Sequence, residues 1–432
     1  SVVRTPSAAS AADARRAVVA VSLEAVLQMV KRTAGGVIDA DAPLMEGGVD
    51  SLGAVELRSL LQQAVGEGIV LSSTLIFDHP TARQVALLVQ GRQSKVGGTT
   101  RGDAVTQRGE GAHVFVSGLG VALPMGATGM AALHKMASDG CDALRAIPAA
   151  RWDLERAALD LVGLPPEVAG RVRHCAFLSD AQLFEHGFFG ISAAEAAAMD
   201  PQQRQLLERG YAGLRVAGMT KASLLGAVVA VNVGQWASEF SKAMVDTAIS
   251  RSVYASTGFQ CSVTCGRVSF VLGLQGPCSS YDTACSASLV GNHSSLRALQ
   301  GSECDEALSA GVNMLFDPAV MLGNAIASMT SVRGRSHTFD ARADGYARGE
   351  AVNAVVCGLH ECEASIAMQG SAIRQDGRSA SLTAPNGQAQ QGVLGAALVD
   401  AQLGTSQVAI LEAHGTGTGL GDPIEAGAIA AM

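Results

Sequence analysis

The chain has 432 residues, of which 48% are hydrophobic, 16% charged and only 4% aromatic. At about 100 to 200 residues per domain, this length predicts two or three domains, whose cores are built from aliphatic side chains rather than rings. The 39 acidic residues outnumber the 31 basic residues and give a net charge of -8, which argues against nucleic acid or an anionic membrane as the main partner.

The nine cysteines contain no CxxC pair at zinc-ligand spacing, so we expect reduced thiols, no metal and a cytoplasmic protein. An organellar location stays open because the chain does not begin with Met. No apolar run approaches the roughly 18 residues that a membrane span needs, and the first residues lack the pattern of a signal peptide. We therefore expect no membrane span.

The first ninety residues predict a small all-α bundle. Apolar residues recur at three-to-four spacing between residues 11 and 32, which indicates an amphipathic helix. A second helix is expected to start at Asp50-Ser51 and a third at Pro80-Thr81, where the residue types suit a helix start. Residues 91–111 are polar and glycine-rich, and we interpret them as a flexible linker.

From Val114 onward the pattern changes to short apolar strands that alternate with helices. Strands that are apolar throughout lie in sheets covered by helices on both faces. The second region is therefore expected to be α/β, with strands at residues 114–116, 227–233, 352–356 and 408–411.

Ser51 opens the second predicted helix, and the triplet Asp50-Ser51-Leu52 by itself is most simply an N-cap. The longer string GVDSLGAVELR at 48–58, with TLIFDHPT at 74–81, closely resembles an acyl carrier protein over residues 12–90. The resemblance implies that Ser51 carries 4'-phosphopantetheine, whose terminal thiol holds the acyl chain as a thioester. A phosphate at a helix N-terminus is physically favourable, because it meets unpaired amide groups and the positive end of the helix dipole.

Cys285 lies where a short predicted strand meets a helix, in the string GPCSSYDTACSASL at 276–289. A helix N-terminus favours the thiolate that attacks a thioester. A single cysteine is otherwise most often a small core residue, and the other eight are interpreted in that way.

His414 follows the predicted strand 408–411, in the string EAHGTGTGLGDPIEA at 412–426. The glycine spacing differs from that of a dinucleotide-binding fingerprint. A tight turn explains the glycines equally well, but a histidine beside two threonines suits thioester chemistry.

The Cys285 and His414 segments resemble the ketosynthase domain of modular polyketide synthases and fatty-acid synthases. The resemblance spans residues 113–432, and it includes the strings FFGIS, MDPQQR, FDARADGY and LTAPNG at 188–192, 199–204, 339–346 and 382–387. We therefore divide the chain into a carrier domain at 12–90, a linker at 91–111 and a β-ketoacyl synthase domain at 112–432. The implied fold is thiolase-like, with two related α/β halves layered αβαβα, and is usually dimeric.

The resemblance also implies a role for each site residue. Cys285 accepts the acyl group from a carrier thiol, and a malonyl-type extender on a second carrier loses CO2 and attacks the Cys285 thioester to give a β-ketoacyl product. His414 assists decarboxylation and stabilises the oxyanion. Thr416 and Thr418 hydrogen-bond the pantetheine arm, and Glu425 supports the site from behind. The expected partners are acyl and malonyl-type thioesters on carrier domains, a phosphopantetheinyl transferase, other synthase domains and a second copy.

In the family, a Lys and a second catalytic His follow the first His, and the chain reaches Met432 without them. We therefore expect a C-terminally truncated domain with an incomplete second half, which condenses poorly alone although its parent protein condenses. Smaller departures from the family pattern are Ala287, Ala351 and Arg374.

Two other functions remain open at this stage. A degradative thiolase shares the fold and the cysteine, but it uses coenzyme A thioesters and has no need of a fused carrier. A non-elongating scaffold would only pass or bind acyl groups at Cys285. The order of carrier and then ketosynthase favours polyketide over fatty-acid assembly, and the acyl substrate stays open.

Overall fold

The computed structural model describes residues 21–36, 38–45, 47–66, 70–94, 113–153, 165–236, 238–361 and 366–432. The chain forms two compact units. The first comprises Ser1–Val105 with Gln375–Gln391 and Pro423–Ala431, and the second comprises Thr106–Arg374 with Gly392–Asp422 and Met432. Each unit is described by itself below.

The N-terminal part of the first unit is helical, as the sequence predicts. Its helices are α1 (Leu23–Ala34), α2 (Ser51–Val65), α3 (Leu75–Asp78) and α4 (Ala82–Ser94). Their apolar faces close on one core, which includes Val26, Val30, Leu57, Leu61 and Val85.

Local signals set the ends of α1. The Ser22 side chain accepts a hydrogen bond from the Ala25 amide at 3.3 Å, and Gly35 ends the helix with a left-handed φ of 70°. The predicted helix at 11–32 therefore begins at Leu23 in the described residues, and residues 11–20 lie outside them. The four-residue α3 was not predicted, because a single turn leaves no periodic pattern.

The second unit is built on a seven-stranded mixed sheet of order β10-β1-β9-β7-β5-β6, with β2 paired to β1. Strands β5, β6 and β7 run parallel, whereas β9 is antiparallel to both β1 and β7. The strands of this sheet are β1 (Val114–Leu123), β2 (Ala127–Thr128), β5 (Val229–Gln235), β6 (Cys278–Tyr281), β7 (Glu306–Asn313), β9 (Ala351–Gly358) and β10 (Ile366–Met368). A second, three-stranded sheet of order β3-β4-β8 is formed by β3 (Arg145–Ala146), β4 (His174–Ala176) and β8 (Arg348–Gly349).

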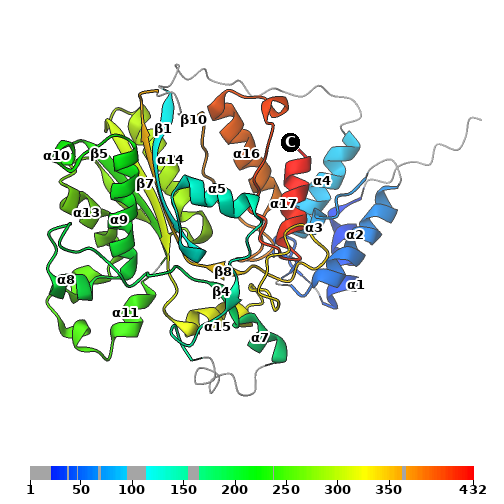
Figure 1. The fold of residues 1–432 in the computed structure, drawn as a ribbon. Helices are drawn as coiled ribbons and strands as arrows, with labels where there is room; N and C mark the ends of the chain where they lie inside the picture. Colours follow the sequence, from blue (N-terminus) through cyan, green and yellow to red (C-terminus); the bar gives the residue numbers. More distant parts are fainter. Residues whose placement is uncertain are drawn as a thin grey trace, which may run out of the picture. The chain divides into compact units, whose positions relative to one another are not determined.

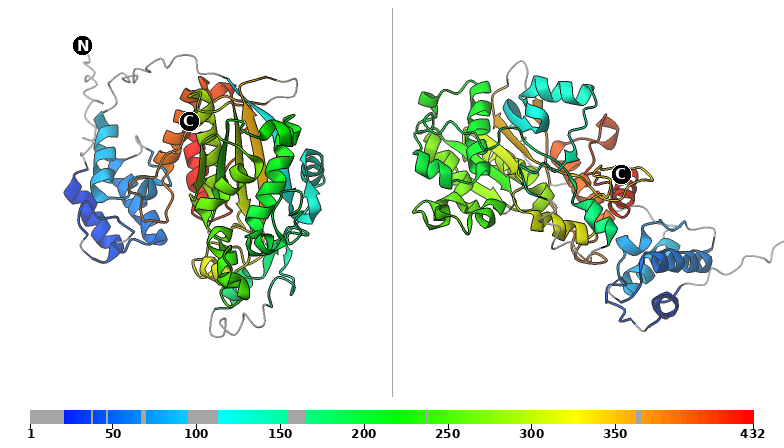
Figure 2. Two further views of the ribbon diagram at one scale, coloured as in Figure 1. Left: turned by 90° about the vertical axis from the view of Figure 1, so that its left-hand side faces the viewer. Right: turned by 60° about the horizontal axis from the view of Figure 1, so that its bottom comes forward.

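Helices cover both faces of the large sheet (Figure 1, Figure 2). On one face α9 (Pro201–Val216) packs on β1, β7 and β9, and α13 (Cys261–Leu272) packs on β5 and β6. Leucines of both helices share one core with Val229, Val231 and Val233 of β5. On the other face α14 (Ala287–Gln300) packs Leu296 and Leu299 against Ala230. Successive residues of β5 thus face opposite helices, which explains why the strand is apolar throughout.

Shorter helices and turns complete the unit. They are α5 (Met130–Ser138), α7 (Pro166–Arg171), α8 (Ala193–Ala198), α10 (Lys221–Leu224), α11 (Glu239–Met244), α12 (Ala255–Gly258) and α15 (Pro318–Ile326). Two further helices, α16 (Gly387–Ala401) and α17 (Gly421–Ala430), contain residues of both units. Among the residues that the structure describes, every helix is too short or too polar to cross a bilayer.

Three of the predicted strands are confirmed, as β1, β5 and β9, whereas the strand predicted at 408–411 is wrong. Residues 408–411 form no strand, and Ile410 is 87% exposed. A strand needs a neighbouring backbone to bond, and no described segment pairs with these residues. For the same reason the second large sheet of the expected αβαβα layering is not found in the described part of the chain.

The structure also bears on the predicted burial of the cysteines and on the predicted linker. Cys141 and Cys278 are exposed rather than part of the core, while Cys175, Cys265, Cys304 and Cys357 are buried as expected. The first four residues of the predicted linker, 91–94, belong to helix α4, which ends at Ser94. The remaining linker residues, 95–111, lie outside the described residues.

The contact between β1 and α9 yields a test of the fold. An added Cβ at Gly120 would lie inside contact distance of the Arg209 carbonyl oxygen, which is backbone and has little room to yield. We expect Gly120→Ala to lower the free energy of unfolding by about 2 kcal/mol, a typical cost of overpacking. The measurement is urea unfolding followed by circular dichroism.

Gly266→Ala in α13 is the control, because a Cβ there meets nothing within 4 Å. This change should be neutral or stabilising by up to about 1 kcal/mol, since alanine favours a helix over glycine. Equal stabilities of the two variants would show that β1 and α9 do not approach as closely as described.

Candidate active site and attachment site

Cys285 lies in a tight turn between β6 and α14. Ala284 adopts a left-handed φ of 53°, which is unusual for a residue other than glycine, and residues Ala284–Ser286 form one 3-10 turn. The Thr283 and Ser286 hydroxyl oxygens are 2.9 Å apart, and the Ser286 hydroxyl also donates to the Thr283 carbonyl at 3.0 Å. The turn leaves Cys285 exposed directly before the first turn of α14.

The start of α14 packs directly against two glycines of neighbouring strands. Gly234 of β5 and Gly311 of β7 are register partners. A Cβ at Gly234 would collide with the backbone of Ala287 and Ser288, and one at Gly311 would lie 2.7 Å from the Ser288 Cβ. The helix can therefore approach the sheet this closely only because neither strand has a side chain there.

The side-chain amide of Asn353 holds strand β7 in place beneath the start of α14. The Gly311 amide donates to the Asn353 Oδ1 at 2.7 Å, and Asn353 stands opposite Gly311 on β9. The carboxyl ends of the parallel strands β5, β6 and β7 meet at the edge where the turn of Cys285 lies. This is the edge at which sheets of this kind bind their ligands.

Tyr346, the last residue of the motif at 339–346, interacts electrostatically with Cys285. Burial raises the pKa of Tyr346, the positive charge of Arg348 lowers it, and a negative charge on Cys285 raises it further. The phenol therefore stays protonated at neutral pH and can donate a hydrogen bond. This interaction depends on the tertiary structure, since 61 residues separate the two positions in the sequence.

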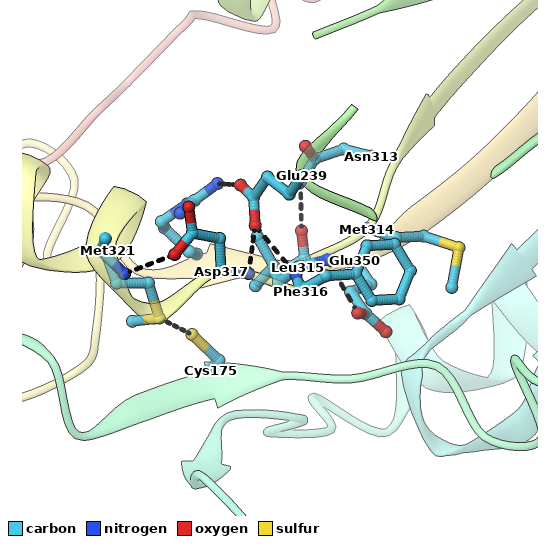
Figure 3. Close-up of polar contacts among 12 residues, drawn as sticks. Cys175, Glu239, Asn313, Met314, Leu315, Phe316, Asp317, Met321 and Glu350 are labelled. Carbon is cyan, nitrogen blue, oxygen red and sulfur yellow. Dashed lines mark hydrogen bonds and ion pairs between the residues drawn. The ribbon is translucent and has the colours of Figure 1, made fainter. Parts of the chain in front are cut away.

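Two buried carboxylates hold the chain where it leaves β7 (Figure 3). Glu350 is 1% exposed and accepts hydrogen bonds from the amides of Leu178 and Leu315, at 2.8 and 2.9 Å. Its other partner is the Arg151 guanidinium, at 2.7 Å. Burial raises the pKa of Glu350, whereas the Leu315 amide and Arg151 lower it.

The second carboxylate, Glu239, accepts from the amides of Phe316 and Asp317, both at 2.8 Å (Figure 3). Three consecutive amides, from Leu315 to Asp317, are thus satisfied by side chains instead of by a strand. The segment after β7 is fixed in this way close to the edge where Cys285 lies.

The His414 loop is pinned to the segment that contains Tyr346. The Thr338 hydroxyl donates to the Gly415 carbonyl at 2.6 Å, and the Gly345 amide donates to the Gly417 carbonyl at 2.9 Å. Asp422 accepts from the Gly417 amide at 2.9 Å and from the Phe339 amide at 2.7 Å. Within the second unit, the structure therefore connects the loop of His414 to the surroundings of Cys285.

The predicted residues of this loop occupy different environments. His414 is exposed, and the Thr416 and Thr418 hydroxyl oxygens are 3.0 Å apart. The Thr418 hydroxyl also accepts from the Gly421 amide at 3.0 Å. Glu425 is half-buried on α17, in the stretch Pro423–Ala431 that belongs to the first unit, so its predicted role stays a prediction.

Ser51 is the first residue of α2, and the capping role belongs to its neighbour. Asp50 is the N-cap, and its Oδ1 accepts from the Gly53 amide at 2.7 Å. The simple interpretation of Ser51 as the N-cap is therefore wrong, because Asp50 already satisfies that amide. Gly48, with a φ of 101°, supplies the turn before the helix.

These residues fit a phosphodiester at Ser51. The 15-residue α2 begins there, and the first turn of a long helix presents backbone amides and a positive dipole to an anion. The described residues show no arrangement of three or more His, Cys, Asp or Glu side chains that could hold a metal ion.

Three family models match the chain. They describe a phosphopantetheine attachment site at residues 24–89, a β-ketoacyl synthase N-terminal domain at 112–360 and a β-ketoacyl synthase C-terminal domain at 366–432.

Curated relatives are polyketide synthases. A pikromycin polyketide synthase component from Streptomyces venezuelae is 39% identical over 407 residues, which are 91% of this chain and 11% of the relative. An erythronolide synthase from Saccharopolyspora erythraea is 36% identical over 419 residues, 94% of this chain and 12% of the relative. The chain thus spans about a tenth of the length of these relatives.

Solved ketosynthases share the fold of the large unit. An oxazolomycin ketosynthase domain from Streptomyces albus superimposes with a TM-score of 0.67 at 29% identity, over 74% of this chain and 57% of that one. The ketosynthase from module 6 of the bacillaene synthase of Bacillus subtilis gives 0.66 at 28% identity, over 74% and 54%. The thiolase-like α/β fold expected from the sequence is confirmed.

The glycine seat of α14 gives a prediction for the thiol. We expect Gly234→Ala to slow the alkylation of Cys285 by iodoacetamide about tenfold or more, because the added Cβ displaces the helix start by a fraction of an ångström or more. Peptide mass spectrometry resolves the rate at this cysteine. Gly323→Ala in α15, where a Cβ meets nothing within 4 Å, should leave the rate unchanged, and a Gly234→Ala rate equal to that of wild type would refute the seat.

Proposed function

The chain belongs to the β-ketoacyl synthase family, and from that premise we propose that it serves polyketide chain assembly, with a carrier centre at Ser51 and a condensing centre at Cys285. The observation that carries the proposal is the strand–turn–helix arrangement at Cys285, where an exposed thiol precedes a helix seated on Gly234 and Gly311. A helix N-terminus stabilises a thiolate, so this position suits a nucleophile for thioesters.

In the first half-reaction, the Cys285 thiolate attacks the carbonyl carbon of an acyl thioester on a carrier arm. A new S–C bond forms, the bond to the carrier sulfur breaks, and the carrier leaves as a thiolate that takes up the proton released when Cys285 ionised. Tyr346, whose raised pKa keeps the phenol protonated and which interacts electrostatically with Cys285, is suited to donate a hydrogen bond in this reaction.

In the second half-reaction, a malonyl-type thioester on another carrier loses its carboxylate as CO2. The electron pair of the broken C–C bond becomes an enolate, which attacks the carbonyl carbon of the Cys285 thioester. A C–C bond forms, and the Cys285 thiolate leaves. We assign His414 to stabilise the enolate oxygen as it develops, Thr416 and Thr418 to hydrogen-bond the pantetheine arm, and Glu425 to support the site.

For the carrier centre we propose Ser51 as the attachment point of 4'-phosphopantetheine within a domain at residues 12–90. The arm supplies a terminal thiol on which the acyl chain is held. The residues of the chain contribute the first turn of α2 and the Asp50 cap that orders it. A phosphopantetheinyl transferase is the partner that this attachment requires.

A domain division of 12–90, 91–111 and 112–432 accompanies this proposal, as does a homodimer of the ketosynthase part. Among the described residues, strand β6 ends the strand order of the large sheet, and an edge strand exposes backbone groups to which another chain can bond. Phe270 on α13 and Leu289 on α14 are 87% and 67% exposed on the two helices that contact β6. We propose that a second copy covers this edge.

The carrier centre is tested by intact mass after incubation with a phosphopantetheinyl transferase and coenzyme A. Wild type should gain one phosphopantetheine arm, and Ser51→Ala should gain none. Ser59→Ala, on the same helix, is the matched control and should gain the arm as wild type does. An unchanged mass of wild type would remove the assignment.

The condensing centre is tested by site-resolved alkylation of the exposed thiols Cys141, Cys278 and Cys285. We expect Cys285 to react first, and burial together with the neighbouring Cys265 raises the pKa of Cys278 and slows that thiol. Cys285→Ala should abolish self-acylation by an acyl N-acetylcysteamine thioester, and Cys141→Ala should not.

Faster alkylation of Cys141 or Cys278 would count against Cys285 as the nucleophile. Acylation of Cys285 without release of CO2 from a malonyl thioester would favour the rival function, an acyl-transfer scaffold that does not elongate.

A further inference from the structure

A polar cluster ties the far end of α14 to α16 and to the segment before it. Arg297 on α14 forms an ion pair with Asp400 on α16 at 2.6 Å, and it donates to the Ser371 carbonyl at 2.8 Å. Asp400 also accepts from the Ser371 amide at 2.9 Å. His293, one turn before Arg297, places its Nδ1 3.1 Å from the Ser371 hydroxyl. We call these four residues the α14 clamp.

The clamp differs from an ordinary surface ion pair. The side chains of Arg297 and Asp400 are 34% and 14% exposed, and one Asp400 oxygen receives both a guanidinium and a backbone amide. Burial and the charge of Arg297 lower the pKa of His293, while Asp400 raises it. The imidazole is therefore neutral near pH 7 and brings no second cation to the carboxylate of Asp400.

The clamp occupies the end of α14 opposite to Cys285. Arg297 is ten residues beyond Ala287, the first residue of the helix, or about 15 Å along its axis. At the near end, the helix rests on Gly234 and Gly311. Because α14 is held at both ends, it can neither rotate nor slide along the sheet.

The other side of the clamp leads to His414. Asp400 is the penultimate residue of α16, whose part from Gly392 onward lies in the second unit together with the His414 loop. Segment 402–413 joins this helix to His414. The clamp thus joins the helix that follows the nucleophile to the helix that precedes the histidine.

We propose that the α14 clamp positions Cys285 relative to the His414 loop, so that Arg297, Asp400, Ser371 and His293 are positioning residues of the condensing site. This inference rests on the proposed function of Cys285. None of the four residues touches the reacting atoms, and their effect is transmitted through the placement of two helices. Misplacement of a reacting group by about 1 Å can cost a factor of a hundred in rate.

The test uses self-acylation of Cys285 by an acyl N-acetylcysteamine thioester in the whole chain. Asp400→Asn removes the carboxylate charge but keeps the size of the side chain. We expect it to lower the maximal acylation rate about tenfold and to leave the half-saturating thioester concentration within about twofold, because orientation rather than binding is lost. The conservative Asp400→Glu should restore at least half of the rate.

Asp142→Asn is the matched control. Asp142 pairs with Arg335 at 2.6 Å, and the Arg335 side chain is 34% exposed, as is that of Arg297. Both Asn variants remove an ion pair, but Asp142 is 53% exposed and Asp400 only 14%, so the thermal midpoint should fall less for Asp142→Asn, and acylation is compared at a temperature well below both midpoints. Only Asp400→Asn should slow acylation. If the two variants acylate equally fast, the clamp is purely structural and the inference is overturned.

His293→Gln is the milder variant, should Asp400→Asn fail to fold. It keeps a hydrogen-bonding group for the Ser371 hydroxyl, and we expect a twofold to fivefold loss of maximal rate; a rate equal to that of wild type would contradict the clamp.

Failure of the proposed function has a different signature, since wild type then gains no acyl group on Cys285. In that case the iodoacetamide rate of Cys285 still tests the clamp: Asp400→Asn should lower it at least threefold and Asp142→Asn should not.

Discussion

The close approach of α14 to the central strands is the constraint on which the condensing site depends. Gly234 and Gly311 let the helix backbone touch the sheet, and this contact places the turn of Cys285 at the carboxyl edge of the parallel strands. A side chain at either glycine would displace the helix start and with it the turn that contains Cys285. The positive φ of Ala284 is the local cost of turning from strand to helix in so short a segment.

The rest of the second unit holds the surroundings of that turn in place. Buried carboxylates at Glu239 and Glu350 satisfy the backbone amides after β7, and Asp422 does the same for the His414 loop and Phe339. Irregular backbone near a reactive centre is kept rigid in this way, because each amide that lacks a strand partner meets a fixed acceptor. Rigidity of this kind suits the function proposed for Cys285, since a preorganised site needs little rearrangement when its substrate binds.

Much of the site was predictable from local patterns. The strand, turn and helix around Cys285 could be recognised because they are contiguous, and the start of α2 at Ser51 could be recognised from the glycine turn and the Asp-Ser pair. Taken alone, that pair suggested Ser51 as the N-cap, because aspartate and serine are both common N-caps, and only the Asp50–Gly53 hydrogen bond decides for Asp50. Local sequence patterns did not predict the roles of Tyr346 and the four clamp residues, since their partners lie far away along the chain.

The sequence by itself determined the fold class, the two kinds of region and the residues most suited to thioester chemistry, because these depend on periodicity, caps and short motifs. The tertiary structure decided which apolar segments become strands: residues 408–411 have strand-like composition but no described partner to pair with, so they stay outside any sheet. It also decided how α14 is held at its two ends, since the contacts of Gly234 and of Asp400 arise only when distant segments pack together. The preference of a segment for helix, strand or turn depends on neighbouring residues, whereas strand pairing and packing depend on the whole chain.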